Sequence, residues 1–432
     1  MRAAFPACAA SRKSCCRFTG TIYTDPMKTF TDSALQLASR LIDQFGPRPP
    51  GSKASRDCAE ALAKEALSFT AAVETEEFTL SPGAFLAWIR LLVAAYAAAL
   101  VLFWMQFFAV AAVILVLGLA LLVAQFFLYR EVIDPFMRRR TGTNVSAVLE
   151  PEGEVKGELI ISGHHDSARI FNFLIHQPGL YGLRINGGMG ALVALALTSL
   201  AAACLKALGL PLDWTGYLAA VFTVLLGLVG QLWFFASPRS TPGAGDNLVS
   251  TTAAWEFLRH CAREKDSGRG LRHLRVRALS FDAEEAGLRG SRAWRKARLA
   301  RGGFGHPVWN LNLECLYDAS EFFFLTSDIN GSVPLSEDFA RRCAVLLEKV
   351  TGQPIPVRPI AFLTGGTDAG ETARAGAEAT TLMGMPWSNS ARSAVYHTPA
   401  DTVEAVSTEA VRAVLELADR LARELDGELT GT

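Results

Sequence analysis

The stretch Ser280–Ser291, SFDAEEAGLRGS, sets two adjacent glutamates at the point where a strand-like run opens into a loop. The run Val276–Phe281 has the character of a core strand, and a Gly-Ser pair closes the stretch. Like charges side by side repel each other, so such a pair lies in water, shares a proton or faces a cation. Other segments of the sequence indicate which of these environments applies to Glu284 and Glu285.

Four further segments carry an imidazole or a carboxylate at the end of an expected strand, at the start of an expected helix or on a late loop. They are GHHDS at 163–167, GAGDN at 243–247, NLE at 312–314 and YHTPADT at 396–402. The strand expected at 158–162 is nearly all apolar, which is typical of a central position in a sheet. Because strand edges in an α/β sheet converge on one crevice, the sequence predicts that these side chains meet.

Strands and helices alternate along the polar part of the chain, which indicates an α/β sandwich. Apolar residues at helical spacing predict helices at 29–45, 54–67, 247–259, 335–350 and 408–425. Strands are expected at 77–80, 144–149, 158–162, 274–281, 308–314, 322–326 and 379–383.

Two long apolar blocks interrupt this domain. Between Phe85 and Tyr129 the one charged residue is Arg90, and a second block runs from about 187 to 236. A single buried core helix of roughly 10–14 residues is too short to account for the first block. The sequence therefore predicts two membrane hairpins, with spans at about 91–108, 109–128, 187–205 and 215–236. Helices buried in a large soluble core are the alternative.

The chain thus divides into a basic extension, three parts of one catalytic domain and two hairpins. The extension covers 1–26, the domain covers 27–84, 130–186 and 237–432, and the hairpins cover 85–129 and 187–236. The extension lacks the apolar core of a secretory signal, and a transit-like segment is one interpretation of it. An upstream extension with Met27 as the working start is the preferred one.

The charges around the hairpins predict their orientation. Arginines flank both hairpins on the side of the catalytic domain, whereas the far connections offer Lys206 opposed by Asp213. The apolar blocks predict an integral membrane protein with about four spans. The positive-inside rule then predicts that its large polar domain lies on the cytoplasmic side. The near absence of ionisable residues within the spans argues against a transporter.

Composition bears on nucleic-acid binding and on the redox compartment of the protein. Lys+Arg and Asp+Glu both number 42, so no charge bias points to nucleic acid. The eight cysteines show no CxxC spacing, and scattered free thiols suit a reducing compartment.

The five clusters together point to metal-dependent hydrolysis. Imidazole and carboxylate groups are the usual ligands of a hydrolytic zinc, which keeps one position open for water. Two metals can share a bridging carboxylate and clamp both water and substrate. A pair of cations would also remove the repulsion between Glu284 and Glu285, one as ligand and the other as general base.

The motifs GHHDS, GAGDN, FDAEEAGLRGS, NLE and YHTPADT resemble those of the co-catalytic zinc aminopeptidases, which include bacterial leucyl aminopeptidases and glutamate carboxypeptidase II. The segment FGPRPPGS at 45–52 is similar to the amino-terminal loop of that family. The resemblance covers roughly 30–84 and 142–425, apart from the second hairpin. It implies a three-layer zinc-exopeptidase-like sandwich with a mixed central sheet, here a membrane-embedded variant interrupted by two transmembrane hairpins.

The resemblance also implies roles, residue by residue. One zinc would be bound by His164 and Glu314, the other by Glu285 and His397. Asp246 would bridge the two ions, which gives two zincs per chain. The groups with other roles would be Glu284 as general base, Asp166 orienting His164, and Tyr396 as a hydrogen-bond donor to the oxyanion.

Two departures from the family pattern stand out. The family usually has aspartate where this chain has Glu314, so one extra methylene must be accommodated. Asp368 is followed by alanine where many relatives have histidine, which makes it a candidate for positioning the substrate. Asp401 is expected to make a local loop hydrogen bond, with help for His397 as the other interpretation. Structural or surface roles are the default for the remaining histidines, His165, His176, His260, His273 and His306.

The resulting hypothesis is a membrane-anchored zinc aminopeptidase that removes residues from peptides with a free amino terminus. A single-zinc glutaminyl cyclase has the same fold, and a non-enzymatic membrane scaffold is a further alternative. The presence of Glu284 and five candidate ligands favours the peptidase. Oligomeric state and side-chain preference stay open.

Overall fold

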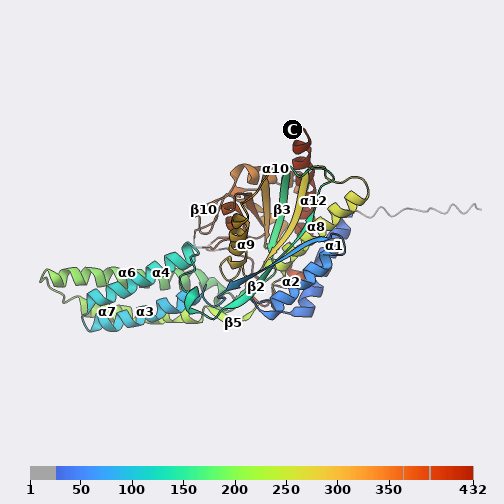
Figure 1. Cartoon of the computed structure of the whole chain (residues 1–432). Helices are drawn as coiled ribbons and strands as arrows, with labels where there is room; N and C mark the ends of the chain where they lie inside the picture. The colour runs from blue at the N-terminus through green and yellow to red at the C-terminus, as the bar shows by residue number, and fades with distance from the viewer. Residues whose placement is uncertain (1–25, 363, 389–390, 432) are drawn as a thin grey trace, which may run out of the picture.

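A computed structural model describes residues 26–362, 364–388 and 391–431. It contains an α/β domain and a bundle of four long helices that projects away from it (Figure 1). The bundle consists of two helical hairpins inserted into the domain at separate points of the chain. The prediction for residues 1–26 falls outside the described residues except for Pro26, the first residue of α1. The residue ranges assigned to the separate parts stay predictions.

The domain is built on an eight-stranded mixed sheet with the order β1-β2-β6-β3-β7-β12-β8-β11. Its four central strands, β6, β3, β7 and β12, are parallel to one another, so their carboxyl ends share one edge. The antiparallel pairs are β1 with β2, β2 with β6, and β12 with β8. The strand bounds are β1 Ala72–Leu80, β2 Arg140–Leu149, β3 Gly157–His164, β6 Leu274–Phe281, β7 Val308–Glu314, β8 Phe323–Leu325, β11 Val357–Arg358 and β12 Glu378–Met383.

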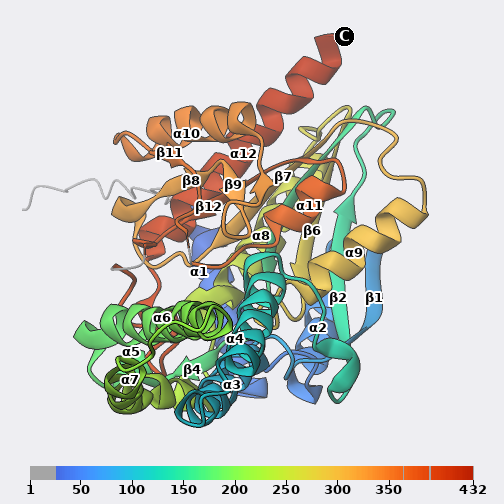
Figure 2. The same cartoon turned by 90° about the vertical axis from the view of Figure 1, so that its left-hand side faces the viewer.

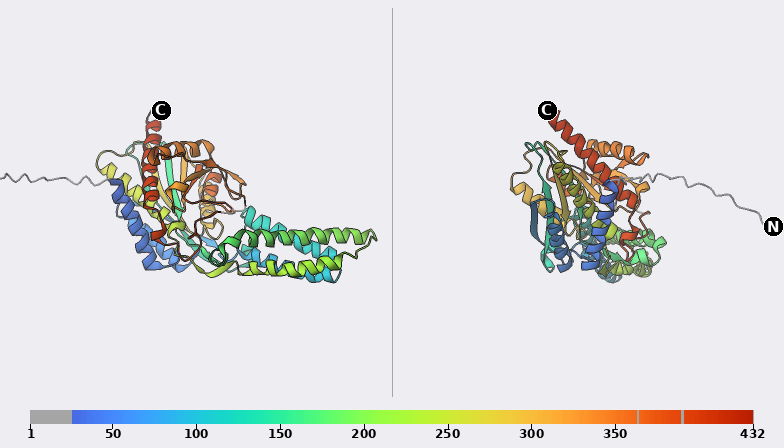
Figure 3. Two further views of the ribbon diagram at one scale, coloured as in Figure 1. Left: turned by 180° about the vertical axis from the view of Figure 1, so that it is seen from behind. Right: turned by 90° about the vertical axis from the view of Figure 1, so that its right-hand side faces the viewer.

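Helices cover both faces of this sheet, because successive strand residues point to opposite sides. In β3, Leu159 and Ile161 join the larger core, whereas Ile160 joins the smaller core on the other face. The larger core is closed by α1 (Pro26–Phe45), α2 (Lys53–Ala66), α8 (Val249–Asp266), α10 (Glu337–Thr351) and α12 (Thr408–Gly431). The other face is covered by α9 (Arg289–Ala300) and α11 (Ala369–Arg374) (Figures 2 and 3). The predicted three-layer α/β sandwich with a mixed sheet is confirmed.

The four helices of the bundle pack in two pairs. Hairpin α3 (Ala87–Trp104) and α4 (Phe108–Leu122) lies against hairpin α6 (Tyr181–Ala207) and α7 (Thr215–Gly230) (Figure 2). The Tyr96 hydroxyl donates to the Phe222 carbonyl at 2.9 Å, which joins α3 to α7. At the far end of the bundle, Lys206 Nζ donates to the Gln106 carbonyl at 2.9 Å.

The outer surface of the bundle is apolar. Large side chains such as Leu117, Leu197 and Val224 are 65%, 63% and 80% exposed. All four helices are long and apolar enough to cross a membrane, over 87–104, 108–127, 178–207 and 215–234. An exposed apolar surface of this extent is unusual in a soluble domain and suits contact with lipid.

Several details of the sequence prediction were wrong. The helix that contains the expected span at 187–205 is longer than that span and begins at Tyr181. The helix expected from 247 starts at Val249, after an irregular π-type turn, η5 (Ala244–Leu248). The elements α9 and α11 were missed, as were two small sheets, β4 (Arg169–Phe171) with β5 (Ala236–Ser240) and β9 (Ser327–Asp328) with β10 (Val333–Pro334). Other short elements are η1 Val123–Phe127, η2 Asp134–Phe136, α5 Asn172–Ile175, η3 Pro178–Leu180, η4 Gln231–Phe234, η6 Ala319–Glu321 and η7 Val403–Ala405.

Candidate active site

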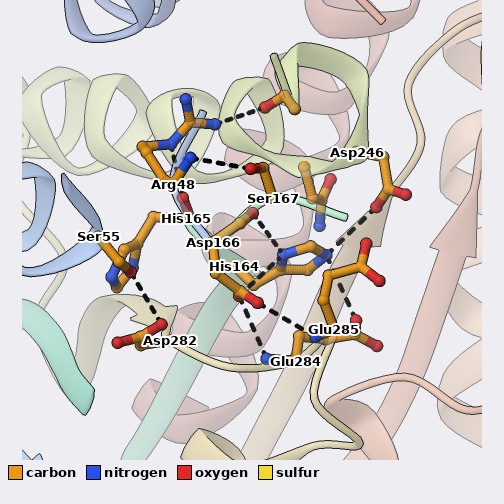
Figure 4. A network of polar contacts seen from close by, with 12 residues as sticks. Arg48, Ser55, His164, His165, Asp166, Ser167, Asp246, Asp282, Glu284 and Glu285 are labelled. Atoms are coloured by element: carbon orange, nitrogen blue, oxygen red, sulfur yellow. Dashed lines mark hydrogen bonds and ion pairs between the residues drawn. The ribbon is translucent and has the colours of Figure 1, made fainter. Parts of the chain in front are cut away.

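The predicted site residues meet at the carboxyl edge of the parallel strands. His164 is the last residue of β3 and Glu314 the last residue of β7. Glu284 and Glu285 follow β6 in the loop that leads to α9, and Asp246 lies in η5. The loop before α12 adds His397. The adjacent strand ends therefore bring together side chains that are far apart in the sequence (Figure 4).

Asp246 lies between the two histidines. Its Oδ1 is 3.3 Å from His164 Nε2, and its Oδ2 is 3.1 Å from His397 Nε2. All three residues are buried. A carboxylate with one oxygen toward each imidazole is the arrangement expected of a group shared by two cations.

Each histidine also faces a glutamate. His164 Nε2 is 3.7 Å from Glu314 Oε2, and His397 Nε2 is 3.4 Å from Glu285 Oε1. The Asn312 amide donates to the other oxygen of Glu314 at 3.1 Å. The longer side chain at position 314 therefore reaches His164 with its orientation fixed by Asn312.

The residues fit a metal centre. His164 Nε2 and Asp246 Oδ2 are buried and make no hydrogen bond, although charged groups surround them. Oxygen and nitrogen atoms from two overlapping sets, His164 with Asp246 and Glu285, and His164 with Glu284 and Glu314, each lie within 4.8 Å of one another. Imidazole and carboxylate donors in these sets suit zinc. Of the three environments possible for Glu284 and Glu285, these distances favour one that faces a cation.

Asp166 holds the paired glutamates and His164 in one arrangement. Its Oδ1 accepts the Glu284 amide and its Oδ2 accepts the Glu285 amide, both at 3.2 Å, while Oδ1 is 3.3 Å from His164 Nδ1 (Figure 4). A carboxylate on Nδ1 favours the tautomer that leaves Nε2 free to ligate. Asp166 is fully buried, so water does not compete for these contacts.

Without an ion, burial disfavours the ionised forms of the two adjacent glutamates. Burial raises the pKa of Glu284 well above its usual range; His164 opposes this shift and Glu285 adds to it. Burial likewise raises the pKa of Glu285 to about 7, against the opposing charge of His397. A bound cation would offset the desolvation of both carboxylates.

Tyr396 and Asp368 differ in their access to the site. The Tyr396 ring lies 4.0 Å from the His397 ring, centroid to centroid, and lines the same cavity as Glu284 and Glu285. Burial raises the pKa of Tyr396 well above its usual range, so its phenol stays protonated and can donate. Asp368 is buried at the start of α11 and does not line this cavity. Direct contact between Asp368 and a substrate therefore has no support in the geometry.

The prediction of a local hydrogen bond for Asp401 was wrong. Its Oδ1 accepts the Gly245 amide at 2.8 Å and its Oδ2 the Asp246 amide at 3.4 Å, so it fixes the backbone of the shared carboxylate. We expect Asp401→Asn to weaken metal retention about 10- to 100-fold, because an amide offers one acceptor instead of two. Zinc retention against a graded chelator measures this.

A matched control exists at the opposite edge of the sheet. The Asp426 carboxylate also accepts backbone amides, those of Arg272, His273 and Leu274, at 2.7–2.9 Å. Asp426→Asn should lower stability and leave zinc retention unchanged. Equal zinc loss in both variants would contradict the role of Asp401.

Sequence reasoning missed three further residues that shape the site. Asp282 accepts the Gly51 amide and the Ser55 hydroxyl with Oδ1 and the Thr143 amide with Oδ2, which ties the loop after α1 to the glutamate loop. Arg48 is fully buried and clamps the loops that carry His164 and Asp246. Cys315 lies within reach of Asp246 and Glu314, but burial raises the pKa of its thiol and keeps it protonated.

Comparison with known proteins supports this description. Residues 229–422 match Peptidase family M28. No curated protein matches the chain. Similar solved structures include a Zn-dependent exopeptidase from Parabacteroides distasonis, with 13% identity, a TM-score of 0.53 and coverage of 91% of this chain and 97% of that one.

Two structures from Bacteroides thetaiotaomicron are also similar. A glutaminyl cyclase has 14% identity and a TM-score of 0.52, with coverage of 90% of this chain and 95% of the other. A leucine aminopeptidase precursor has 14% identity and a TM-score of 0.50, with coverage of 90% and 94%. These likenesses establish the fold and leave the choice between the two activities to the site. The match to Peptidase family M28 over residues 229–422 and the shared fold of the zinc exopeptidases agree with the resemblance to the co-catalytic zinc aminopeptidases.

Proposed function

We propose that the protein is a membrane-anchored zinc aminopeptidase that holds two ions per chain and hydrolyses peptides with a free amino terminus. The observation that carries the proposal is Asp246 between His164 and His397, one carboxylate oxygen toward each. Glu314 on the first side and Glu285 on the second complete two ligand sets.

The side chains around this centre have distinct tasks. Zinc, when bound, polarises the scissile carbonyl and makes water more acidic. Glu284 accepts the proton of the attacking water and later delivers it to the leaving amine. The Tyr396 hydroxyl donates a hydrogen bond to the oxyanion that develops on the carbonyl oxygen. Asp166 fixes the relative positions of His164 and Glu284, because its carboxylate contacts His164 Nδ1 and accepts the Glu284 backbone amide.

We further propose that α3, α4, α6 and α7 cross the bilayer and that the catalytic domain faces the cytoplasm. The apolar outer surface of the bundle supports membrane insertion. Arg90, Arg138, Arg139 and Arg140 lie at the end of the bundle next to the domain, as the positive-inside rule requires for a cytoplasmic side.

Zinc content tests the proposal first. We expect about two zincs per chain in the detergent-purified protein, and fewer in Glu285→Ala, because that variant removes a carboxylate beside His397. Elemental analysis of both proteins measures this, together with release of amino acids from unmodified peptides.

The alternatives give different results in the same experiment. One zinc per chain, with ring closure of amino-terminal glutamine and no peptide hydrolysis, would replace the peptidase with a cyclase. Absence of tightly held metal in both proteins would favour a scaffold without activity.

A further inference from the structure

A cavity of about 630 Å³ leads from the candidate active site into the helical bundle. Glu284, Glu285, Tyr396 and His397 line its inner end. The opposite walls come from the ends of the bundle helices nearest the domain, namely Trp88 and Ile89 of α3, Leu119 and Leu122 of α4, Met189 and Val193 of α6, and Leu232 of η4. The volume lies within the range of about 300–1,000 Å³ that is usual for small-ligand sites.

The cavity extends well into the apolar part of the bundle. Its lining residues on α6 run from Tyr181 to Val193, which is about 18 Å of helix at 1.5 Å per residue. Figure 2 looks along the bundle toward the domain and shows α4 and α6 side by side. Because a bilayer core is about 30 Å thick, a ligand filling the cavity would extend below the membrane surface in the proposed arrangement.

Arginines occupy the polar part of the same cavity. Arg138, Arg140 and Arg169 are exposed and line it. No acidic residue within the described part of the chain forms an ion pair with any of them. Arg90 and Arg140 lie close enough to Arg169 for their charges to act on it. The described carboxylates in the lining are Glu284 and Glu285, which the proposed function assigns to the metal centre and to proton transfer.

This combination selects a particular kind of ligand. An apolar compartment of this depth stabilises large aliphatic or aromatic side chains by about 25 cal/mol per Å² of surface removed from water. An arginine cluster without acidic partners favours a carboxylate, which arginine can bind through two parallel hydrogen bonds. The positive charge of the arginine cluster disfavours ligands that would place a cationic group beside it.

We propose that the site takes short hydrophobic peptides with a free carboxyl terminus. Their apolar side chains lie between the helices, and their carboxylate pairs with the cluster formed by Arg138, Arg140 and Arg169. The inference rests on the proposed aminopeptidase function and adds the substrate class to it. Both the apolar and the cationic walls belong to the inserted hairpins or to segments beside them, so this preference follows from the insertion.

The apolar half of the inference is tested with Val193→Trp, which fills the part of the cavity between the bundle helices. Leu197→Trp is the control, since Leu197 is on the same helix, 63% exposed and outside the cavity lining. We expect the unmodified enzyme in detergent to cleave trileucine with a kcat/KM more than about tenfold above that for trialanine. Val193→Trp should abolish most of this preference while zinc content stays unchanged, whereas Leu197→Trp should change neither the preference nor the zinc content.

The cationic half is tested with Arg169→Gln against Arg139→Gln, an exposed neighbour that does not line the cavity. We expect Arg169→Gln to raise KM for trileucine about tenfold and to leave KM for trileucine amide unchanged, because the amide has no carboxylate to lose. Equal losses for both peptides would overturn the carboxylate contact.

Failure of the inference is distinguishable from failure of the proposed function. If neither trileucine nor trialanine is cleaved by a zinc-loaded enzyme, the aminopeptidase proposal itself fails. If both are cleaved at similar rates and Val193→Trp behaves like Leu197→Trp, the aminopeptidase stands and the substrate class is wrong.

Discussion

Glu284→Gln is expected to lower kcat for peptide hydrolysis by about 10²- to 10⁴-fold while zinc content stays unchanged. Glutamine keeps the size and the backbone hydrogen bond to Asp166, but it cannot accept the proton of the attacking water. Glu284 lies 3.8 Å from His164 Nε2, the longest of the distances from that nitrogen to a surrounding carboxylate oxygen. Steady-state kinetics with matched zinc analysis measures both effects.

The neighbouring glutamate provides the contrast. Glu285→Gln should lose zinc and activity together, because Glu285 lies beside His397 in the second ligand set. If Glu284→Gln lost zinc as readily as Glu285→Gln, the two glutamates would share the ligand role and the assignment of the base would be wrong.

Arg48→Ala is expected to destabilise the fold by about 4 kcal/mol or more. The guanidinium is fully buried and donates to the carbonyls of Gly46, His165, Pro242 and Gly243 at 2.7–3.0 Å. Removing it leaves four carbonyl groups without these donors and opens a cavity between three loops. A denaturant or thermal unfolding series in detergent measures the loss.

Arg56→Ala is a suitable control for Arg48→Ala. Arg56 donates to the Thr141 carbonyl at 3.4 Å from a more exposed position, so its loss should change stability by less than about 0.5 kcal/mol. Similar losses in the two variants would contradict a special role for Arg48. Since the Arg48 clamp reaches both the His165 and the Gly243 carbonyls, zinc retention should fall along with stability.

The convergence of the site could be predicted because it follows from topology. His164 and Glu314 end parallel strands, and Glu284 follows a third, so the rule for α/β sheets was enough to bring them together. The adjacent glutamates were recognisable because such a pair has few favourable environments. Expected strand positions were accurate wherever an apolar run was bounded by polar turns, as at β3 and β6.

The supporting contacts could not be predicted in the same way. Arg48 and Asp401 bind backbone groups far away in the sequence, and backbone groups leave no pattern in the residue types. The short strands β4 and β5 are specified by their pairing across an entire hairpin rather than by their own residues. The cavity depends on how two hairpins pack against each other and against the domain, which no local periodicity encodes.

The second hairpin has a consequence for how the protein is made. It lies in the chain between His164 and Asp246, and β4 pairs with β5 at its base, with Arg169 opposite Ser240. In the proposed arrangement, the nascent chain leaves the ribosome with His164 in place, crosses the bilayer twice and only then supplies Asp246. In that arrangement the candidate metal centre is completed only after the second hairpin has entered the membrane, so the order of synthesis would link assembly of the centre to membrane insertion.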